Sequence, residues 1–242
     1  MPRKRLDQLV VDSGLSPSRE RARALILAGQ VLVDGRVVSK AGTQVDADAE
    51  ISLVAPDHPY VGRGGVKLAH AIDTFQIPVA GRLALDIGAS TGGFTDALLQ
   101  RGAARVVALD VGHGQLDWGL RNDPRVVVIE GANARSLALD TLPAPVDIVI
   151  VDVSFISLRH ILPVLPPLLA PAADVVVLVK PQFEAGRAEV RKGVIHDPDI
   201  HARVVGEISA AAAEVGLKSV GSVPSPITGA KGNLEFFLHL RT

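Results

Sequence analysis

The sequence contains no cysteine, which removes several kinds of chemistry at once. A disulfide framework, a thiolate metal site and a cysteine nucleophile are all excluded. Aromatic residues make up only 3% of the chain, so few side chains are available to stack on a planar ligand. An excess of one charge is also lacking, because 25 Lys and Arg residues nearly balance 26 Asp and Glu residues. Any basic surface must therefore be local.

Apolar runs long enough to span a bilayer are absent as well. The two most apolar stretches, around residues 148–153 and 161–179, are interrupted by aspartates and prolines. The basic N-terminus is not followed by the apolar segment of a secretory signal. We therefore expect a cytoplasmic protein that has no membrane partner.

The length and the order of apolar runs predict the fold class. A chain of 242 residues allows one α/β core and a small accessory domain. Near-continuous apolar runs, typical of parallel strands covered on both faces, alternate with helical segments. These runs are residues 83–86, 106–110, 126–130, 148–152 and 175–180. We predict an α/β protein with a doubly wound Rossmann-like sheet and a small N-terminal α+β domain.

The first 54 residues have the pattern of two helices followed by a hairpin. Ser16 is expected to cap a helix that begins at Pro17 and ends before Gly29. The Asp34-Gly35 pair between two β-branched runs favours a type I′ turn. Residues 55–65, rich in proline and glycine, are expected to be a linker to a larger domain of residues 66–242.

The local basic surface lies in the first forty residues, where eight Lys and Arg residues stand against four Asp and Glu residues. A solvated helix face explains this charge as well as RNA binding does. The order of residues adds to it, because Arg5-Leu6-Asp7 and the segment 18–35 resemble the αL RNA-binding motif of a small-subunit ribosomal protein and many RNA-modifying enzymes. This resemblance implies RNA contacts by Arg3, Lys4, Arg5, Arg19, Arg23 and Lys40.

A glycine-rich turn follows the first predicted strand and opens a helix. Its spacing, Asp86-x-Gly88-x-x-x-Gly92-Gly93, does not match the dinucleotide fingerprint. It resembles the first motif of Rossmann-like methyltransferases, which implies S-adenosylmethionine as the cofactor. A nucleotide-binding turn and a merely structural turn are the alternatives. The expected cofactor contacts in this segment are Asp86, Gly88, Ser90, Gly92, Gly93 and Phe94.

Two further strand ends contribute to the expected cofactor site. Asp110 ends the second strand, where a carboxylate can accept hydrogen bonds from two ribose hydroxyls. Asn133 follows the third strand, where the adenine edge is expected, although a loop Asn is more often a turn former. Both residues belong to the predicted site.

Four charged residues are placed to converge on the carboxyl edge of the sheet, where ligands bind in open α/β folds. Asp152 and Lys180 end the fourth and fifth strands. Glu235 begins the last strand, which reaches the same edge if it is antiparallel, as in the methyltransferase fold. Lys67 lies on a short helix before the first strand. One such residue is usually only solvated, but four together with the glycine motif indicate a site.

Five segments carry a closer family resemblance. Residues 62–68, 86–96, 110–118, 152–158 and 179–184 look like the TlyA family. These are rRNA 2'-O-methyltransferases, historically labelled haemolysins, with an FtsJ-type catalytic domain. The similarity runs essentially end to end.

The resemblance implies a catalytic tetrad of Lys67, Asp152, Lys180 and Glu235 acting on a cytidine ribose, with Lys180 nearest the hydroxyl. Lysine side chains are mostly protonated at neutral pH, so a base role and an alkoxide-stabilising role both stay open for Lys180. The implied partner is ribosomal RNA within a subunit, bound by a monomer without a metal ion.

Other functions fit less well. Methylation of an exocyclic amine is expected to show an Asn/Asp-Pro-Pro-aromatic turn, whereas this chain has Asp152-Val153-Ser154-Phe155. Methylation at cytosine carbon five needs a cysteine. A pore-forming haemolysin is the non-enzymatic alternative, and a binding module without activity is disfavoured by the complete tetrad.

Two more residues are expected to contact RNA, and one feature bears on the target. Phe155 is a candidate to stack on a flipped-out base, with a core position below the strand end as the alternative. Arg63 precedes the Lys67 helix in the expected linker.

The chain stops at Thr242, directly after its last predicted strand, whereas family members that modify both subunits are said to carry short extensions. We therefore expect large-subunit RNA as the target.

Overall fold

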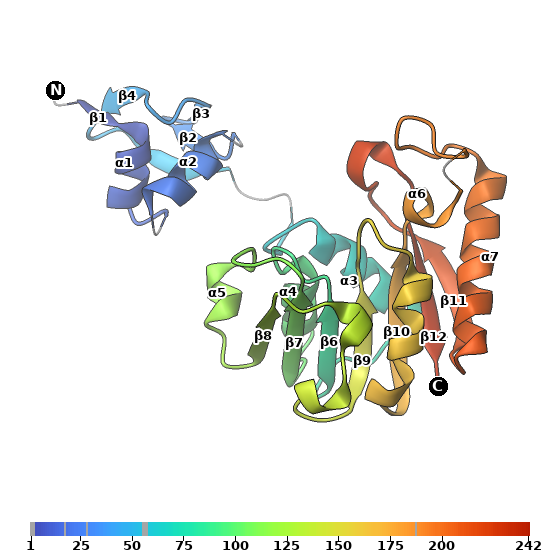
Figure 1. The fold of residues 1–242 in the computed structure, drawn as a ribbon. Coiled ribbons are helices and arrows are strands. Elements are labelled where there is room, and N and C mark those ends of the chain that lie inside the picture. Colours follow the sequence, from blue (N-terminus) through green and yellow to red (C-terminus); the bar gives the residue numbers. More distant parts are fainter. Residues whose placement is uncertain (1–2, 17, 28, 55–57, 187) are drawn as a thin grey trace. The chain divides into compact units, whose positions relative to one another are not determined.

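The computed structural model describes residues 3–16, 18–27, 29–54, 58–186 and 188–242, and the chain divides into two compact units (Figure 1). The smaller unit comprises residues 1–59 and the larger unit residues 60–242. Residues 60–65, expected in the linker, thus belong to the larger unit. Val61 N donates to Asp96 Oδ2 at 2.8 Å and Gly65 N donates to the Gly62 carbonyl at 3.0 Å, which ties this segment to the domain. Residues 55–57 of the expected linker lie outside the described residues.

The smaller unit is an α+β domain, as predicted. Two strands, β1 and β4, form one sheet, and β3, β2 and β5 form another in that order. The buried faces of α1 and α2 make the core together with Val31 and Val45. The elements are β1 (Arg3–Arg5), α1 (Leu6–Asp12), α2 (Arg19–Leu27), β2 (Val31–Val33), β3 (Arg36–Val37), β4 (Gln44–Asp46) and β5 (Ile51–Leu53).

In this unit the structure confirms the predicted hairpin but places the start of the second helix later than predicted. Asp34 and Gly35 have φ of 48° and 75°, as the type I′ turn between β2 and β3 requires. Helix α2 begins two residues later than expected, because the Ser18 hydroxyl accepts from Arg21 N at 3.2 Å and caps it. The Ser16 hydroxyl instead donates to the Ser18 carbonyl. Pro17 lies outside the described residues.

The larger unit is built on a seven-stranded sheet with the order β11-β12-β10-β9-β6-β7-β8, which confirms the doubly wound Rossmann-like fold. Neighbouring strands from β10 to β8 pair in parallel, whereas β12 is antiparallel to both β10 and β11. The strands are β6 (Leu83–Ile87), β7 (Arg105–Asp110), β8 (Val126–Glu130), β9 (Val146–Val151), β10 (Leu169–Val179), β11 (Lys218–Pro224) and β12 (Phe236–Arg241).

Helical segments cover both faces of this sheet (Figure 1). On one face, α3 (Gly64–Phe75) and α4 (Gly93–Gln100) pack against the strands; on the other lie α7 (Pro198–Glu214) and three 3₁₀ turns. These turns are η3 (Leu158–His160), η4 (Leu162–Val164) and η5 (Pro166–Leu168). Successive strand residues point to opposite faces, so Ala84 joins the first layer and Leu85 the second. The shorter segments are α5 (Trp118–Arg121), α6 (Pro181–Glu184), η1 (Ala134–Ser136), η2 (Leu139–Thr141) and η6 (Ala230–Gly232).

The antiparallel last strand brings distant residues to one edge. Asp152 directly follows β9, and Lys180 directly follows β10. Val179 at the end of β10 pairs with Phe236 at the start of β12, so Glu235 reaches the same edge. Lys67 lies in the first turns of α3, a helix of twelve residues rather than the short one expected.

Candidate active site

The four predicted tetrad residues form two ion pairs at the carboxyl edge of the sheet. Lys67 Nζ donates to Glu235 Oε2 at 2.6 Å, and Lys180 Nζ lies 2.5 Å from Asp152 Oδ1. Lys180 Nζ also donates to the Ser154 hydroxyl at 2.9 Å. All four residues line one cavity of about 330 Å³, called here the tetrad pocket. Each ammonium group is therefore held by a carboxylate at the wall of the same cavity.

A glycine allows Glu235 to take this position. A Cβ atom at Gly229 would lie 1.9 Å from Glu235 Oε1, so any side chain there would displace the carboxylate. Glu235 is itself buried, and its partner Lys67 is largely covered. A buried carboxylate is stable only when it is paired, which explains why Lys67 points inward from α3.

A second cavity, of about 530 Å³, lies beside the first and is called here the turn pocket. It is lined by the ends of β6, β7, β9 and the segment after β8, and its walls are mostly apolar. Gly88, Ser90 and Asp152 line both pockets, so the two cavities meet at the glycine-rich turn. The volume lies in the range of small-molecule sites.

Asp110 is fixed at the edge of the turn pocket by backbone donors. Ser90 N donates to its Oδ2 at 2.8 Å, and Gly112 N donates to its Oδ1 at 2.7 Å. Each carboxylate oxygen keeps a free lone pair for a further donor. A pair of ribose hydroxyls is such a ligand, so the donor set fits the nucleoside part of S-adenosylmethionine.

The glycine-rich turn is shaped by close backbone contacts. Gly88 has φ of 90°, and a Cβ there would lie 2.2 Å from the Asp152 carbonyl. The turn can therefore lie directly against the end of β9 only with glycine at this position.

Two predicted cofactor contacts do not line either pocket. Asp86 is completely buried below the turn, where its Oδ2 accepts from the Thr95 hydroxyl at 2.7 Å. Burial raises the pKa of the Asp86 carboxyl to about 7. Gly92, with φ of 98°, faces Leu116 and Leu120 instead of a cavity. Asp86 faces the core because successive side chains of β6 alternate between opposite sides of the sheet, whereas Gly92 precedes α4 and packs against two leucines.

The other predicted cofactor contacts divide between the pockets. Asn133 lines the turn pocket, and its side-chain oxygen also accepts from Arg135 N at 3.1 Å, the turn-forming role that was the alternative. Gly93 and Phe94 line the tetrad pocket instead. The buried Phe94 ring packs near Phe237 of β12.

Phe155 lies at the junction of the two pockets and is 91% exposed. The alternative of a core position is therefore wrong. Its backbone has φ of 65°, a conformation that costs a residue other than glycine about 1–2 kcal/mol. Its ring lies 5.0 Å from that of Phe183, so two aromatic rings sit at the pocket mouth. Arg63, the other RNA contact expected in this domain, is exposed and also lines the tetrad pocket.

In the smaller unit, one buried carboxylate holds three of the arginines expected to contact RNA. Asp7 is completely buried and accepts from Arg5 at 3.0 Å, Arg19 at 3.1 Å and Arg23 at 3.0 Å. The hydrogen bond from Arg5, followed by those from Arg23 and Arg19, holds the pKa of Asp7 well below its usual range. The three arginine side chains remain about half exposed. This arginine cluster, Arg5, Arg19 and Arg23, keeps net positive charge at the surface.

The other expected RNA contacts in this unit have surroundings of their own. Lys4 pairs with Asp12 at 2.8 Å, and Arg3 lies 3.6 Å from Asp46. Lys40 is exposed in the loop before β4.

Several pocket residues were not among the predicted contacts. Ser154 binds Lys180, and the Phe183 ring lies tilted against that of Phe155. Gln115 lines the turn pocket with its side chain 3.4 Å from the Ser90 hydroxyl. Thr228, in the loop before β12, lines the tetrad pocket. Ser154 and Phe183 lie two and three residues beyond Asp152 and Lys180, so their proximity to predicted residues was a usable signal.

The part of the chain that the structure describes lacks two features. None of its helices has the length and apolar character needed to cross a bilayer. Within the same residues, His, Asp and Glu side chains form no group of three or more that could hold a metal ion.

Comparison with known proteins identifies both domains. A family model described as FtsJ-like methyltransferase matches residues 60–242, and the S4 domain model matches residues 4–51. A Mycobacterium tuberculosis protein named 16S/23S rRNA (cytidine-2'-O)-methyltransferase TlyA is 50% identical over 99% of this chain and 90% of its own length. A Campylobacter jejuni protein named 23S rRNA (cytidine-2'-O)-methyltransferase TlyA is 33% identical over 74% of this chain and 70% of its own.

A solved structure agrees with this match. A protein from Streptococcus thermophilus, named as a hemolysin, is 42% identical and superposes with a TM-score of 0.78. That comparison covers 100% of this chain and 89% of the solved one. The two domain matches and these identities show that the chain belongs to the TlyA family, with an S4 domain followed by an FtsJ-like methyltransferase domain.

Proposed function

We propose that this protein transfers a methyl group from S-adenosylmethionine to the ribose 2'-hydroxyl of a cytidine in ribosomal RNA. The observation that carries the proposal is the junction of two cavities at Asp152, with a ribose-binding carboxylate in one and two lysine–carboxylate pairs in the other. The names of relatives that are 50% and 33% identical support the cytidine and the ribose oxygen as the acceptor.

The turn pocket is the place for the cofactor. Asp110 would accept from its ribose hydroxyls, and Asn133 would contact its adenine, while Gly88 and Ser90 line the same pocket. The bound cofactor supplies an electrophilic methyl group carried by a sulfonium. The protein therefore has to orient the acceptor and to manage its proton.

The tetrad pocket is the place for the acceptor ribose. Asp152 and the Ser154 hydroxyl fix Lys180 Nζ from two sides, so its remaining N–H bond can be directed at the 2'-oxygen. An ammonium group at this position stabilises the negative charge that develops as the hydroxyl loses its proton. Glu235 holds Lys67 at the wall of the same pocket, where its ammonium group would bind the acceptor nucleotide. This assigns Lys180 to alkoxide stabilisation, with the proton leaving to water.

Phe155 and the arginine cluster would bind the RNA. An exposed ring beside the reaction site can stack on a base turned out of its helix, at about 1–3 kcal/mol per base. The arginine cluster would contact phosphates, because guanidinium groups held at one surface match their geometry and charge. Binding by phosphate contacts weakens as the salt concentration rises.

The experiment that tests the function is methyl transfer to purified ribosomal subunits. Large and small subunits lacking this modification are incubated separately with radiolabelled S-adenosylmethionine and the full chain. We expect label in RNA with the wild-type protein and a loss of at least about 100-fold with Lys180→Ala, whereas the surface control Lys218→Ala keeps full activity. The large subunit is the first expected target. Unlabelled RNA in both subunits would refute the proposed function.

A further inference from the structure

Two segments that flank the site run side by side and are joined by three sets of contacts. Residues 152–158 follow β9, and residues 180–184 follow β10. In the first set, Lys180 binds both Asp152 and Ser154. In the second, the rings of Phe155 and Phe183 lie 5.0 Å apart. Glu184 makes the third set of contacts.

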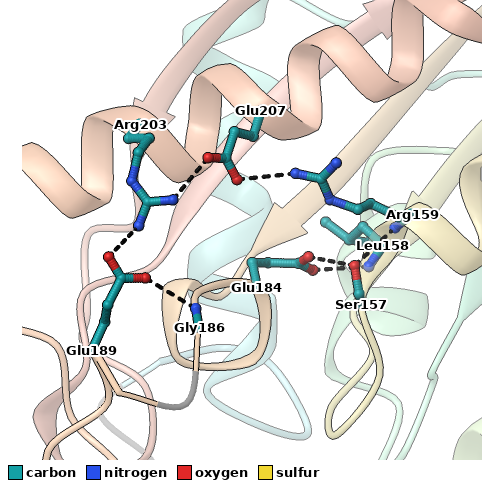
Figure 2. A network of polar contacts seen from close by, with 8 residues as sticks. All are labelled: Ser157, Leu158, Arg159, Glu184, Gly186, Glu189, Arg203 and Glu207. Carbon is teal, nitrogen blue, oxygen red and sulfur yellow. Dashed lines mark hydrogen bonds and ion pairs between the residues drawn. The ribbon is translucent and has the colours of Figure 1, made fainter.

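Glu184 binds the far end of the β9 loop with both carboxylate oxygens. Its Oε2 accepts from the Ser157 hydroxyl at 2.6 Å, and its Oε1 accepts from Leu158 N at 2.8 Å (Figure 2). The side chain is half-buried, and this burial raises the pKa of the carboxyl above its usual value. A carboxylate held in this way, on a short helix directly beyond Lys180, has no contact with either pocket itself.

Phe155, which lies between these contacts, has a strained backbone. Phe155 has φ of 65°, and almost all of its side chain is exposed. A backbone in this region persists only when its surroundings fix it, since relaxation to an ordinary conformation would gain about 1–2 kcal/mol. Phe155 has few packing contacts of its own, so the anchors on both sides of it, Lys180 before and Glu184 after, must supply the restraint.

We propose that Glu184 is a positioning residue that holds Phe155 in its outward conformation and so prepares the site for the acceptor nucleotide. Its two hydrogen bonds fix residues 157 and 158, which leaves the β9 loop too short to relax between them and Asp152. Loss of these bonds frees the loop, and the Phe155 ring then samples other orientations. The stacking role of Phe155 rests on the proposed function, whereas the restraint by Glu184 does not.

The same region offers a matched control. Glu189 accepts from Gly186 N at 3.0 Å and pairs with Arg203, which also binds Glu207 (Figure 2). Glu207 in turn accepts from Arg159 at 3.0 Å. These contacts tie the neighbouring loop to α7 but leave both hydrogen bonds of Glu184 in place. Glu189→Ala therefore removes a nearby carboxylate without releasing Ser157 or Leu158.

The restraint is tested directly by fluorine NMR of the full chain. The six phenylalanines are replaced by 4-fluorophenylalanine, and the Phe155 signal is assigned with Phe155→Leu. We expect Glu184→Ala to shift and broaden this signal, Glu184→Gln to have a smaller effect because its amide oxygen still accepts one bond, and Glu189→Ala to leave it unchanged. An unchanged Phe155 signal in Glu184→Ala overturns the proposal whether or not the protein methylates RNA.

The functional consequence is tested by kinetics in a double-mutant cycle. Glu184→Ala should raise KM for the ribosomal subunit about tenfold while the Kd for S-adenosylmethionine stays unchanged. In a Phe155→Ala background the same substitution should have almost no effect, because the ring that it positions is gone. Additive effects of the two substitutions would show that Glu184 acts elsewhere. Failure of the wild-type protein to methylate RNA would refute the proposed function, and the NMR result would still decide the restraint.

Discussion

Lys67 Nζ donates a hydrogen bond to Glu235 Oε2 at 2.6 Å, although 168 residues separate the two in the sequence. The lysine comes from the first helix of the methyltransferase domain and the glutamate from the start of its last strand. Glu235 is 3% exposed, and Lys67 is the partner with which it forms an ion pair among the residues that the structure describes. The pair therefore joins the two ends of the domain at the wall of the tetrad pocket.

Removing one partner of this pair should lower the free energy of unfolding more than removing both partners does. Lys67→Met leaves a buried carboxylate unpaired, and we expect the free energy of unfolding to fall by about 3–5 kcal/mol. The double variant Lys67→Met/Glu235→Leu removes both charges and should recover most of that loss, while neither variant transfers methyl groups. Urea denaturation and the methyl-transfer assay give both readouts. A Lys67→Met protein as stable as the wild type would show that Glu235 is not charged and paired.

The pH dependence of stability should report on Asp86. Its pKa is about 7 in the folded protein because of burial, compared with 3.8 for an ordinary Asp. The folded state therefore holds this proton more tightly than the unfolded state, so the stabilising contribution is complete below pH 4 and is lost as pH rises through 7. Asp86→Asn cannot ionise and escapes this loss.

We expect the free energies of unfolding of the wild type and of Asp86→Asn to change differently with pH. Between pH 5 and pH 8, the free energy of unfolding of Asp86→Asn should improve relative to wild type by about 2–3 kcal/mol. Urea denaturation at several pH values measures this change. A constant difference across the range would mean that Asp86 is ionised throughout.

Cofactor affinity should depend on Asp110. Asp110→Asn replaces one acceptor oxygen by a donor, which disrupts one of the bonds from Ser90 N and Gly112 N and leaves one oxygen fewer to accept from a ribose. We expect the Kd for S-adenosylmethionine to rise at least about tenfold in calorimetry. Asp140→Asn, an exposed carboxylate outside both pockets, is the matched control. Equal Kd values for S-adenosylmethionine in the wild type, Asp110→Asn and Asp140→Asn would show that Asp110 does not bind the ribose.

Much of the site could be predicted from the sequence because parallel strands end at one edge. Asp152 and Lys180 follow apolar runs, and that pattern alone placed both at the carboxyl edge. The pairing of Lys67 with Glu235 needed the family resemblance, since no local pattern shows which way the last strand runs. The burial of Asp86 below the turn was missed, because spacing does not reveal which side chains of a strand face the core. Gly92 was missed because the residues that pack against it, Leu116 and Leu120, come later in the chain.

Phe155 should carry strain that glycine relieves. Phe155→Gly places at φ of 65° the residue that best tolerates it, so stability should rise by about 1 kcal/mol while KM for the ribosomal subunit increases. Gln76, with φ of 53° at the end of α3, offers the control. Gln76→Gly should gain similar stability at unchanged activity. A loss of stability in Phe155→Gly alone would indicate that the ring packs into the domain.

The sequence was least informative about loops. The expected linker included residues 60–65, because glycines and a missing periodicity look the same in a linker and in a turn packed against α4. The exposed position of Phe155 depends on a positive φ and on contacts with residues 180–184, and neither is encoded within its own neighbourhood. Three-dimensional contacts therefore decide the details that sequence patterns leave open.

The central claim is most directly tested by identifying the methylated nucleoside. Subunits treated with the protein and S-adenosylmethionine are digested to nucleosides and analysed by mass spectrometry, with Lys180→Ala as the control. The proposed function predicts a gain of 2'-O-methylcytidine that is absent with Lys180→Ala. A methyl group found on a base, or on the ribose of another nucleoside only, would contradict it.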